Sequence, residues 1–139
     1  MHEMAACPAD KAAAICEAWL ARHAEHERLI HRWQALETEL FRRPDWGRLT
    51  ERERARLPQV AEMEALNTRI NGLFDHNRKD LGRLSCLAAT TATSLLQKLR
   101  VAAALVAPDE NEEAHALLQS ILRDAGGGAL TGPEKAARR

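Results

Sequence analysis

The side chains that could bind a metal ion gather on one predicted helix near the N-terminus. They are histidines and a glutamate spaced three or four residues apart, at His23, His26, Glu27 and His31. A helix brings residues at that spacing onto one face or two adjacent faces. A facing helix could complete the site, as in metal-binding bundles, from Asp75, His76 or Asp80. The metal candidates are therefore His23, His26 and His76, and a metal-binding helical-bundle enzyme is one hypothesis.

A structural role for the same histidines is the simpler interpretation, and we favour it. No glutamate of this helix is followed by a histidine three residues later, as the motif of di-metal carboxylate bundles requires. If the chain turns back near residues 44–57, facing residues have numbers that add up to roughly 100. His23, His26 and Asn77 then form a polar layer in an otherwise apolar seam. Such a layer lowers stability but fixes the register of the helices, so no metal or other cofactor is expected.

Arginine is concentrated in the segment that should form the tip of this hairpin. The candidates for contact with nucleic acid are six arginines and a tryptophan: Arg42, Arg43, Trp46, Arg48, Arg52, Arg54 and Arg56. Arginine can grip phosphate and an aromatic ring can stack on a base. Alternatively, arginine and glutamate pair along a solvated short helix while Trp46 covers the end of the core. Six arginines against three acidic residues leave a net charge of only plus three, so nucleic-acid binding is the second hypothesis.

No pattern typical of a catalytic nucleophile is present. The cysteines are Cys7, Cys16 and Cys86, without a Cys-x-x-Cys pair, which fits a reducing cytoplasm better than a disulfide scaffold. Cys16 and Cys86 should lie in or beside the seam as small apolar groups. The triple glycine beginning at Gly126 follows a predicted helix instead of opening one, so it is not a phosphate loop. We expect a protein without catalytic activity.

Composition predicts an all-helical protein. Of 139 residues, 45% are hydrophobic and 29% charged, and tyrosine is absent, while alanine, leucine, glutamate and arginine dominate. The 20 basic and 20 acidic side chains give a net charge of zero, which argues against a nucleic-acid coat or a polybasic membrane anchor. The longest apolar run, 101–107, is far too short to span a membrane, and the N-terminus lacks the pattern of a signal peptide. We expect a cytoplasmic protein without a membrane partner.

Helix-starting and helix-breaking residues divide the chain. The sequence predicts long helices over about 8–43 and 58–86 and shorter helices over about 50–57, 92–107 and 109–124. Thr50 with Glu53, and Asp109 with Glu112, are the expected helix caps. A helix should end near residues 88–91, because the adjacent threonines there fit poorly inside a helix, and Pro58 should either kink a helix or open one. Residues 1–125 should form a single helical domain, and 126–139 a disordered tail.

The two long helices should pack as an antiparallel hairpin, because their apolar residues repeat with heptad spacing. Expected neighbours across the seam are Arg22 and His23 with Asn77 and Arg78, His26 with Phe74, and Trp33 with Leu66. The seam residues expected to be largely buried are Trp19, Trp33, Leu36, Met63, Ile70, Leu81 and Leu84. The helix ending near Ala107 should also be buried, because its end is almost wholly apolar.

The segment after the second long helix carries a resemblance. Ala88-Ala89-Thr90-Thr91, Ser94-Leu95 and Lys98 resemble a Pro-Ala-Thr-Thr, Gly-Leu, Lys pattern in short all-helical bacterial proteins of unknown function, with Ala88 in place of proline and Ser94 in place of glycine. The resemblance covers about the last third of the chain and implies a helical fold. It implies no activity.

A single hairpin of two long helices leaves apolar faces uncovered. Three tryptophans on or near the first helix and the apolar helix over 92–107 add to that surface. The first hypothesis is therefore a non-catalytic cytoplasmic interaction or scaffold protein that forms a homodimer, most simply a four-helix bundle. A protein partner other than a second copy is also compatible with such a surface.

Overall fold

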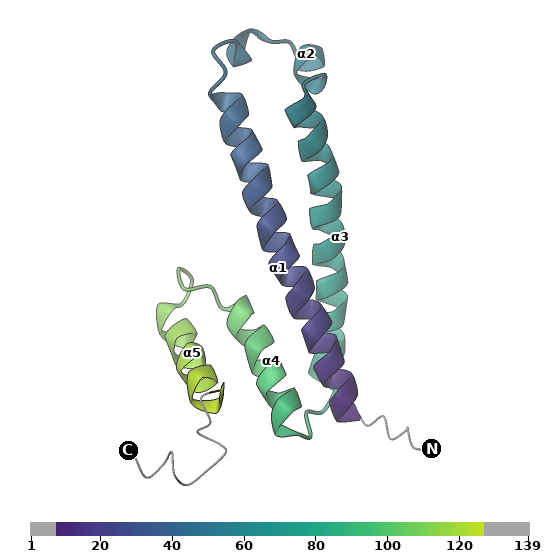
Figure 1. Ribbon diagram of the computed structural model, residues 1–139, viewed down its shortest axis with the longest axis vertical. Coiled ribbons are helices and arrows are strands. Elements are labelled where there is room, and N and C mark those ends of the chain that lie inside the picture. Colours follow the sequence, from purple (N-terminus) through teal and green to yellow (C-terminus); the bar gives the residue numbers. More distant parts are fainter. Residues whose placement is uncertain (1–7, 127–139) are drawn as a thin grey trace. The chain divides into compact units, whose positions relative to one another are not determined.

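The computed structural model describes residues 8–126, and every regular element in that range is a helix (Figure 1). The elements are α1 (Pro8–Phe41), the 3-10 helix η1 (Trp46–Arg48), α2 (Glu51–Ala55), α3 (Pro58–Cys86), α4 (Ala92–Leu105) and α5 (Glu112–Gly126). The all-helical fold class is confirmed. No helix in the described range is long and apolar enough to cross a membrane.

Three of the observed helices end slightly earlier than the sequence suggested, whereas α3 ends at Cys86 as predicted and α5 ends at Gly126, later than residue 124. α1 stops at Phe41 rather than at residue 43, α2 at Ala55 rather than 57, and α4 at Leu105 rather than 107. Pro58 opens α3, which is one of the two roles expected for it, because proline at the first position of a helix lacks only an N–H that would have no partner. The expected disordered tail falls almost entirely on residues 127–139, which lie outside the described part of the chain.

Side-chain caps start two of the helices where the sequence predicted them. Thr50 Oγ1 accepts a hydrogen bond from the Glu53 backbone N–H at 3.1 Å, and the Glu53 carboxylate accepts one from the Thr50 N–H. Thr91 and Ser94 form the same reciprocal capping box at the start of α4. Each box pairs backbone donors that the first turn of a helix leaves unsatisfied. The predicted break between residues 88 and 91 is therefore a real helix boundary.

The cap of α5 differs from the predicted one. The Ala114 N–H donates to Asn111 Oδ1 at 2.9 Å, so Asn111 occupies the capping position expected for Asp109. Asn111 is placed there by a turn, in which its N–H donates to the Ala107 carbonyl. The helix begins at Glu112, and an asparagine caps a helix as effectively as an aspartate.

The described residues separate into two compact units. One unit is a hairpin formed by residues 21–81. The other combines residues 8–20 with 82–126. The expectation of one domain over residues 1–125 stays a prediction.

The hairpin unit pairs the later part of α1 with the earlier part of α3 in opposite directions (Figure 1). Arg22 Nε donates to Asn77 Oδ1 at 2.7 Å, and the rings of His26 and Phe74 lie 6.4 Å apart. Both pairs were expected from the antiparallel register. Two exposed ion pairs bridge the same helices, Glu25 with Arg69 and Arg32 with Glu62. The apolar residues Leu36 and Leu40 of α1 and Leu73 of α3 are buried.

The seam residues expected to be buried are all at least partly covered. Trp19, Leu36 and Leu84 are buried, whereas Trp33, Met63, Ile70 and Leu81 are half-buried. Trp19 and Leu84 belong to the second unit and Leu36 to the hairpin. A two-helix hairpin covers one side only of each seam residue, so half-burial is the normal outcome along it.

The second unit has its own small core. Its buried apolar residues are Ala12, Ile15, Cys16, Trp19, Leu84, Val101 and Ala103. α4 packs against α5, and His115 Nδ1 lies 2.6 Å from the Val106 carbonyl oxygen at the turn between them. The Lys98 ammonium donates to the Leu87 carbonyl and so ties α4 to the segment before it. The expectation that α4 is buried holds only for one face, because Leu95 and Leu105 are exposed.

Candidate functional site

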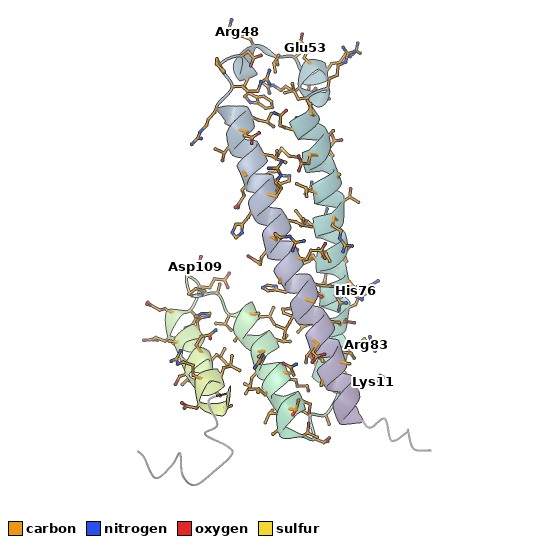
Figure 2. All side chains as sticks on the ribbon, in the orientation of Figure 1. Lys11, Arg48, Glu53, His76, Arg83 and Asp109 are labelled. Carbon is orange, nitrogen blue, oxygen red and sulfur yellow. The ribbon has the colours of Figure 1, made fainter. Side chains whose placement is uncertain are left out.

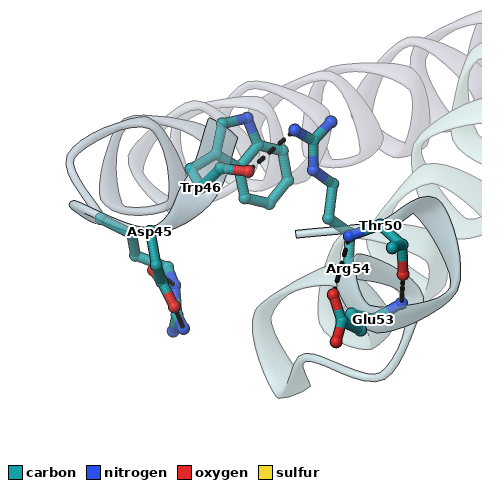
Figure 3. A network of polar contacts seen from close by, with 6 residues as sticks. Asp45, Trp46, Thr50, Glu53 and Arg54 are labelled. Atoms are coloured by element: carbon teal, nitrogen blue, oxygen red, sulfur yellow. Dashed lines mark hydrogen bonds and ion pairs between the residues drawn. The ribbon is translucent and has the colours of Figure 1, made fainter. Parts of the chain in front are cut away.

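Trp46 is the centre of the hairpin tip and makes contacts on two sides. The Arg54 guanidinium carbon lies 4.2 Å from the centroid of the Trp46 ring, a cation–π contact. The Phe41 ring approaches edge-on, with centroids 5.9 Å apart and an interplanar angle of 61°. Arg54 Nη2 also donates to the Trp46 carbonyl oxygen at 2.8 Å (Figure 3). These contacts fix the half-buried indole ring at the end of the hairpin.

Two of the tip arginines are therefore held by other residues of the tip. Arg54 projects from α2, whose capping box lies beside it in Figure 3. Arg43 donates two hydrogen bonds to the Asp45 carboxylate, at 3.1 and 3.0 Å. The hydrogen bonds from Arg43 lower the pKa of Asp45 below its usual range. Neither guanidinium is fully available to a phosphate.

The other four arginines predicted to contact nucleic acid are exposed: Arg42, Arg48, Arg52 and Arg56. Arg48 and Glu53 both lie at the tip (Figure 2), so acidic side chains are interspersed among the basic ones, as the sequence indicated. The Arg54 guanidinium lies over the Trp46 ring, so less of the ring surface is available for stacking with a base. The structure thus brings the predicted residues together but engages three of the seven with one another or with neighbours.

A pocket of about 290 Å³ opens beside Trp46, between the ends of α1 and α3. Its apolar lining consists of Trp33, Leu40, Phe41, Trp46, Val60 and Met63. Its polar lining consists of Glu37, Glu64 and Asn67. Sequence reasoning missed this pocket, although Glu37 lies one turn from both Trp33 and Phe41 and so shares their side of α1.

A polar cluster lies further down the hairpin seam. The Arg22 guanidinium donates to Asn77 and to the Asp80 carboxylate, and both acceptors are buried. His76 Nε2 lies 3.9 Å from the same carboxylate. A polar layer at Asn77 was expected. Arg22 Nε donates a hydrogen bond to Asn77 Oδ1, and His23 Nε2 lies 4.0 Å from the Glu27 carboxylate on its own helix. His26 packs against Phe74.

The histidines do not form a metal site with other potential ligands in residues 8–126. No group of three or more histidine, cysteine or carboxylate side chains there is placed to hold a metal ion. His23 Nε2 lies 4.0 Å from the Glu27 carboxylate, and His76 Nε2 lies 3.9 Å from the Asp80 carboxylate. His31 is exposed on α1.

The apolar side chains left exposed are not the tryptophans. Trp19 is buried and Trp33 and Trp46 are half-buried. The large apolar residues that are exposed are Phe41, Phe74, Leu95, Leu105, Leu117 and Ile121. Four of these six residues lie on α4 and α5, in the second unit.

Comparisons with protein-family models, with curated proteins and with solved structures give no match to this chain. The resemblance around Thr90 and Thr91 stays a prediction. The function is accordingly inferred from the described side chains alone.

Proposed function

We propose that the protein is a non-catalytic cytoplasmic interaction protein that self-associates as a two-fold dimer through the apolar face of α4 and α5. The observation that carries this proposal is the exposure of α5. None of its residues is buried, although it has a well-defined apolar face. α4 packs against α5 and leaves Leu118 and Leu122 half-buried, whereas Leu117 and Ile121 beside them on this face are exposed. A partner on this face would supply the missing contacts.

Two large apolar residues of α5 and two of α4 are exposed. Leu117 and Ile121 are 62% and 38% exposed, and their spacing of four residues places them on one side of the helix. On α4, Leu95 and Leu105 are 54% and 47% exposed. Isolated exposed leucines are ordinary in soluble proteins, but apolar residues that share a helical face indicate a contact surface.

The area on this face suits a reversible dimer. Full burial of a leucine or isoleucine contributes about 2 kcal/mol, so covering the exposed fractions of these four residues contributes about 4 kcal/mol per protomer. Two protomers gain about 8 kcal/mol, whereas association costs about 4–15 kcal/mol. Even at the lowest association cost the net gain is about 4 kcal/mol, so these residues alone support a dimer with a dissociation constant on the order of 1 mM or weaker, unless further contacts add to it.

The charges of α5 favour a second copy as the partner. Glu112 and Glu113 lie in its first turn and Arg123 in its last. A two-fold axis across the apolar face pairs two α5 helices in opposite directions. The acidic turn of one copy then lies near Arg123 of the other, although Asp124 follows Arg123 in that turn, and the helix dipoles run antiparallel. Four helices, α4 and α5 from each copy, make a small bundle.

Sedimentation equilibrium over a concentration series tests the dimer. The wild-type chain should shift from 15.5 kDa towards twice that mass as its concentration rises. The double variant Leu117→Gln/Ile121→Gln should remain a monomer, because it removes the central contacts without adding charge. Phe74→Gln is the matched control, since Phe74 is 56% exposed but lies on the hairpin. A monomer throughout the series, or a dimer that persists in the double variant, would remove this proposal.

The second candidate function is contact with nucleic acid through the hairpin tip, and the exposure of four tip arginines favours it. Binding to a mixed-sequence duplex at about 50 mM salt should weaken steeply towards about 200 mM if phosphates are contacted. A triple variant, Arg48→Ala/Arg52→Ala/Arg56→Ala, should abolish that binding. The matched control removes three exposed arginines elsewhere: Arg28, Arg78 and Arg100. No binding at low salt, or equal loss in both variants, would rule out the tip as a specific site.

A further inference from the structure

The pocket beside Trp46 combines aromatic walls with carboxylates. Trp33, Phe41 and Trp46 contribute three aromatic rings, and Glu37 and Glu64 contribute two acidic side chains. All of these residues belong to the hairpin unit, residues 21–81. Each is half-buried or exposed, so the pocket is open to solvent and a ligand could enter without any movement of the helices.

The pocket is large enough for a small organic molecule. Its volume is about 290 Å³. An engineered cavity of about 150 Å³ accommodates benzene, and a water molecule occupies about 30 Å³ in the liquid. The pocket beside Trp46 therefore holds roughly ten non-hydrogen atoms.

The charges of the lining select the sign of the ligand. Glu37 and Glu64 form no ion pair with any residue of the described chain, and no basic side chain belongs to the lining. Arg54 contacts the lining residue Trp46, and its guanidinium is held by the ring and the carbonyl of that residue. Two unpaired carboxylates outnumber that one arginine, so the lining favours a cation and disfavours an anion.

The aromatic rings favour a cation of a particular kind. The face of an indole ring attracts a positive charge, and Trp46 already accepts one in Arg54 at 4.2 Å. Trp33 and Phe41 place two further rings around the same space. The rings and the aliphatic side chains of the lining can also pack against apolar atoms of a ligand. An organic cation has such atoms, whereas a small, strongly hydrated metal ion does not.

We propose that this pocket binds a small organic monocation, with an alkylated ammonium group and an apolar body. The ammonium lies near Glu37 and Glu64 and against the aromatic rings, and the apolar body covers Leu40, Val60 and Met63. This site is independent of the proposed dimer face, because every residue that lines it belongs to the hairpin.

Titration with benzyltrimethylammonium, followed by tryptophan fluorescence and by calorimetry, tests the site directly. The cation should bind with a dissociation constant on the order of 1 mM or tighter, given its small size. Phenylmethanesulfonate has a similar ring but a negative charge and should not bind. Equal binding of the two probes, or binding of neither, would overturn the proposal.

A pair of charge variants tests the role of the carboxylates. Glu37→Gln/Glu64→Gln keeps the shape of the lining and should weaken binding of the cation roughly tenfold at low salt. Glu39→Gln/Asp75→Asn removes the same charge from exposed positions of the same two helices outside the lining, and should bind as the wild type does. Unchanged affinity in the first variant would show that the carboxylates do not recognise the ligand.

Salt dependence of the wild-type chain provides a readout that does not depend on how the variants fold. Screening should weaken binding of the cation as salt rises from about 50 to 500 mM, because the carboxylates are solvent-accessible. Affinity that is independent of salt would indicate apolar contact only and would contradict the assigned charge preference.

Discussion

The contact between Arg22 and Asp80 makes a sharp prediction about stability. Both side chains lie in the hairpin seam, with side-chain exposures of 18% and 8%. The guanidinium also donates to Asn77, so one arginine joins two buried acceptors from α3. Removal of the carboxylate by Asp80→Ala would leave this positive charge in a partly dry seam.

The expected loss in the free energy of unfolding is about 3 kcal/mol. Removal of one partner from a fully buried ion pair costs about 3–5 kcal/mol, because an uncompensated charge remains. Arg22 keeps its hydrogen bond to Asn77 and some contact with water, which places the cost at the lower end of that range. A loss of that size is far larger than the effect of an ordinary surface substitution, about 0.5 kcal/mol.

Urea denaturation followed by far-ultraviolet circular dichroism measures the change. Arg22→Met, Asp80→Leu and the double variant complete a mutant cycle, and the double variant should be more stable than the sum of the single losses predicts, because it leaves no unpaired charge. Arg69→Met at the exposed pair with Glu25 is the control and should shift the midpoint little. A loss below about 1 kcal/mol in Asp80→Ala, or additive effects in the cycle, would refute the reasoning.

Three further predictions concern other parts of the chain. Thr91→Ala should cost about 1 kcal/mol in the free energy of unfolding, since it removes the cap of α4, and urea denaturation measures this against Thr91→Ser, which keeps the hydroxyl. In a background without the N-terminal cysteine, the exposed Cys86 should react rapidly with a thiol reagent, whereas Cys16 should react only on unfolding, because it is buried and burial raises the pKa of its thiol. Hydrogen bonds from arginines lower the pKa of Glu25 and of Glu62, so both carboxylates stabilise the fold above the usual glutamate pKa, and this stability is lost as the pH falls through the lowered pKa values. On acid titration, the variant Glu25→Gln/Glu62→Gln should therefore lose less stability below about pH 4 than the wild type does. An unchanged titration would contradict this.

Local features of the fold were predictable because they depend on a few neighbouring residues. The capping box of Thr50 and Glu53 needs only the spacing of its two members. The break before α4 was likewise visible in the adjacent threonines, and the box of Thr91 and Ser94 explains it. At the start of α5, both Asp109 and Asn111 could serve as the cap. The turn in which the Asn111 N–H donates to the Ala107 carbonyl places Asn111 at the capping position.

The register of the hairpin was predictable, since Arg22 with Asn77 and His26 with Phe74 were both expected pairs. Because facing residues were expected to have numbers that add up to roughly 100, both Arg22 and His23 were placed near Asn77. Successive residues of a helix differ by about 100° in direction. Arginine has the longer side chain and carries a permanent charge, so Arg22 reaches Asn77 and Asp80 from beside the seam. A long side chain of this kind cannot be assigned to the seam from periodicity alone, since its Cβ does not have to point there.

The tip was predictable in composition but not in its contacts. Its arginines were evident in the sequence, yet Arg43 and Arg54 turn inward to Asp45 and Trp46. The pocket was not evident, because its walls come from α1, α3 and the segment between them, and only folding brings these together.

The dimer and the cation pocket use different residues, and this makes the two proposals separable. Leu117 and Ile121 lie on α5, in the unit that contains residues 82–126, whereas Glu37 and Glu64 lie in the hairpin of residues 21–81. The glutamine variant of α5 should therefore bind benzyltrimethylammonium as the wild type does, and the glutamine variant of the pocket should sediment as the wild type does. If loss of self-association also abolished binding of the cation, the two sites would be coupled through the assembly, and the pocket would have to be completed by the second copy.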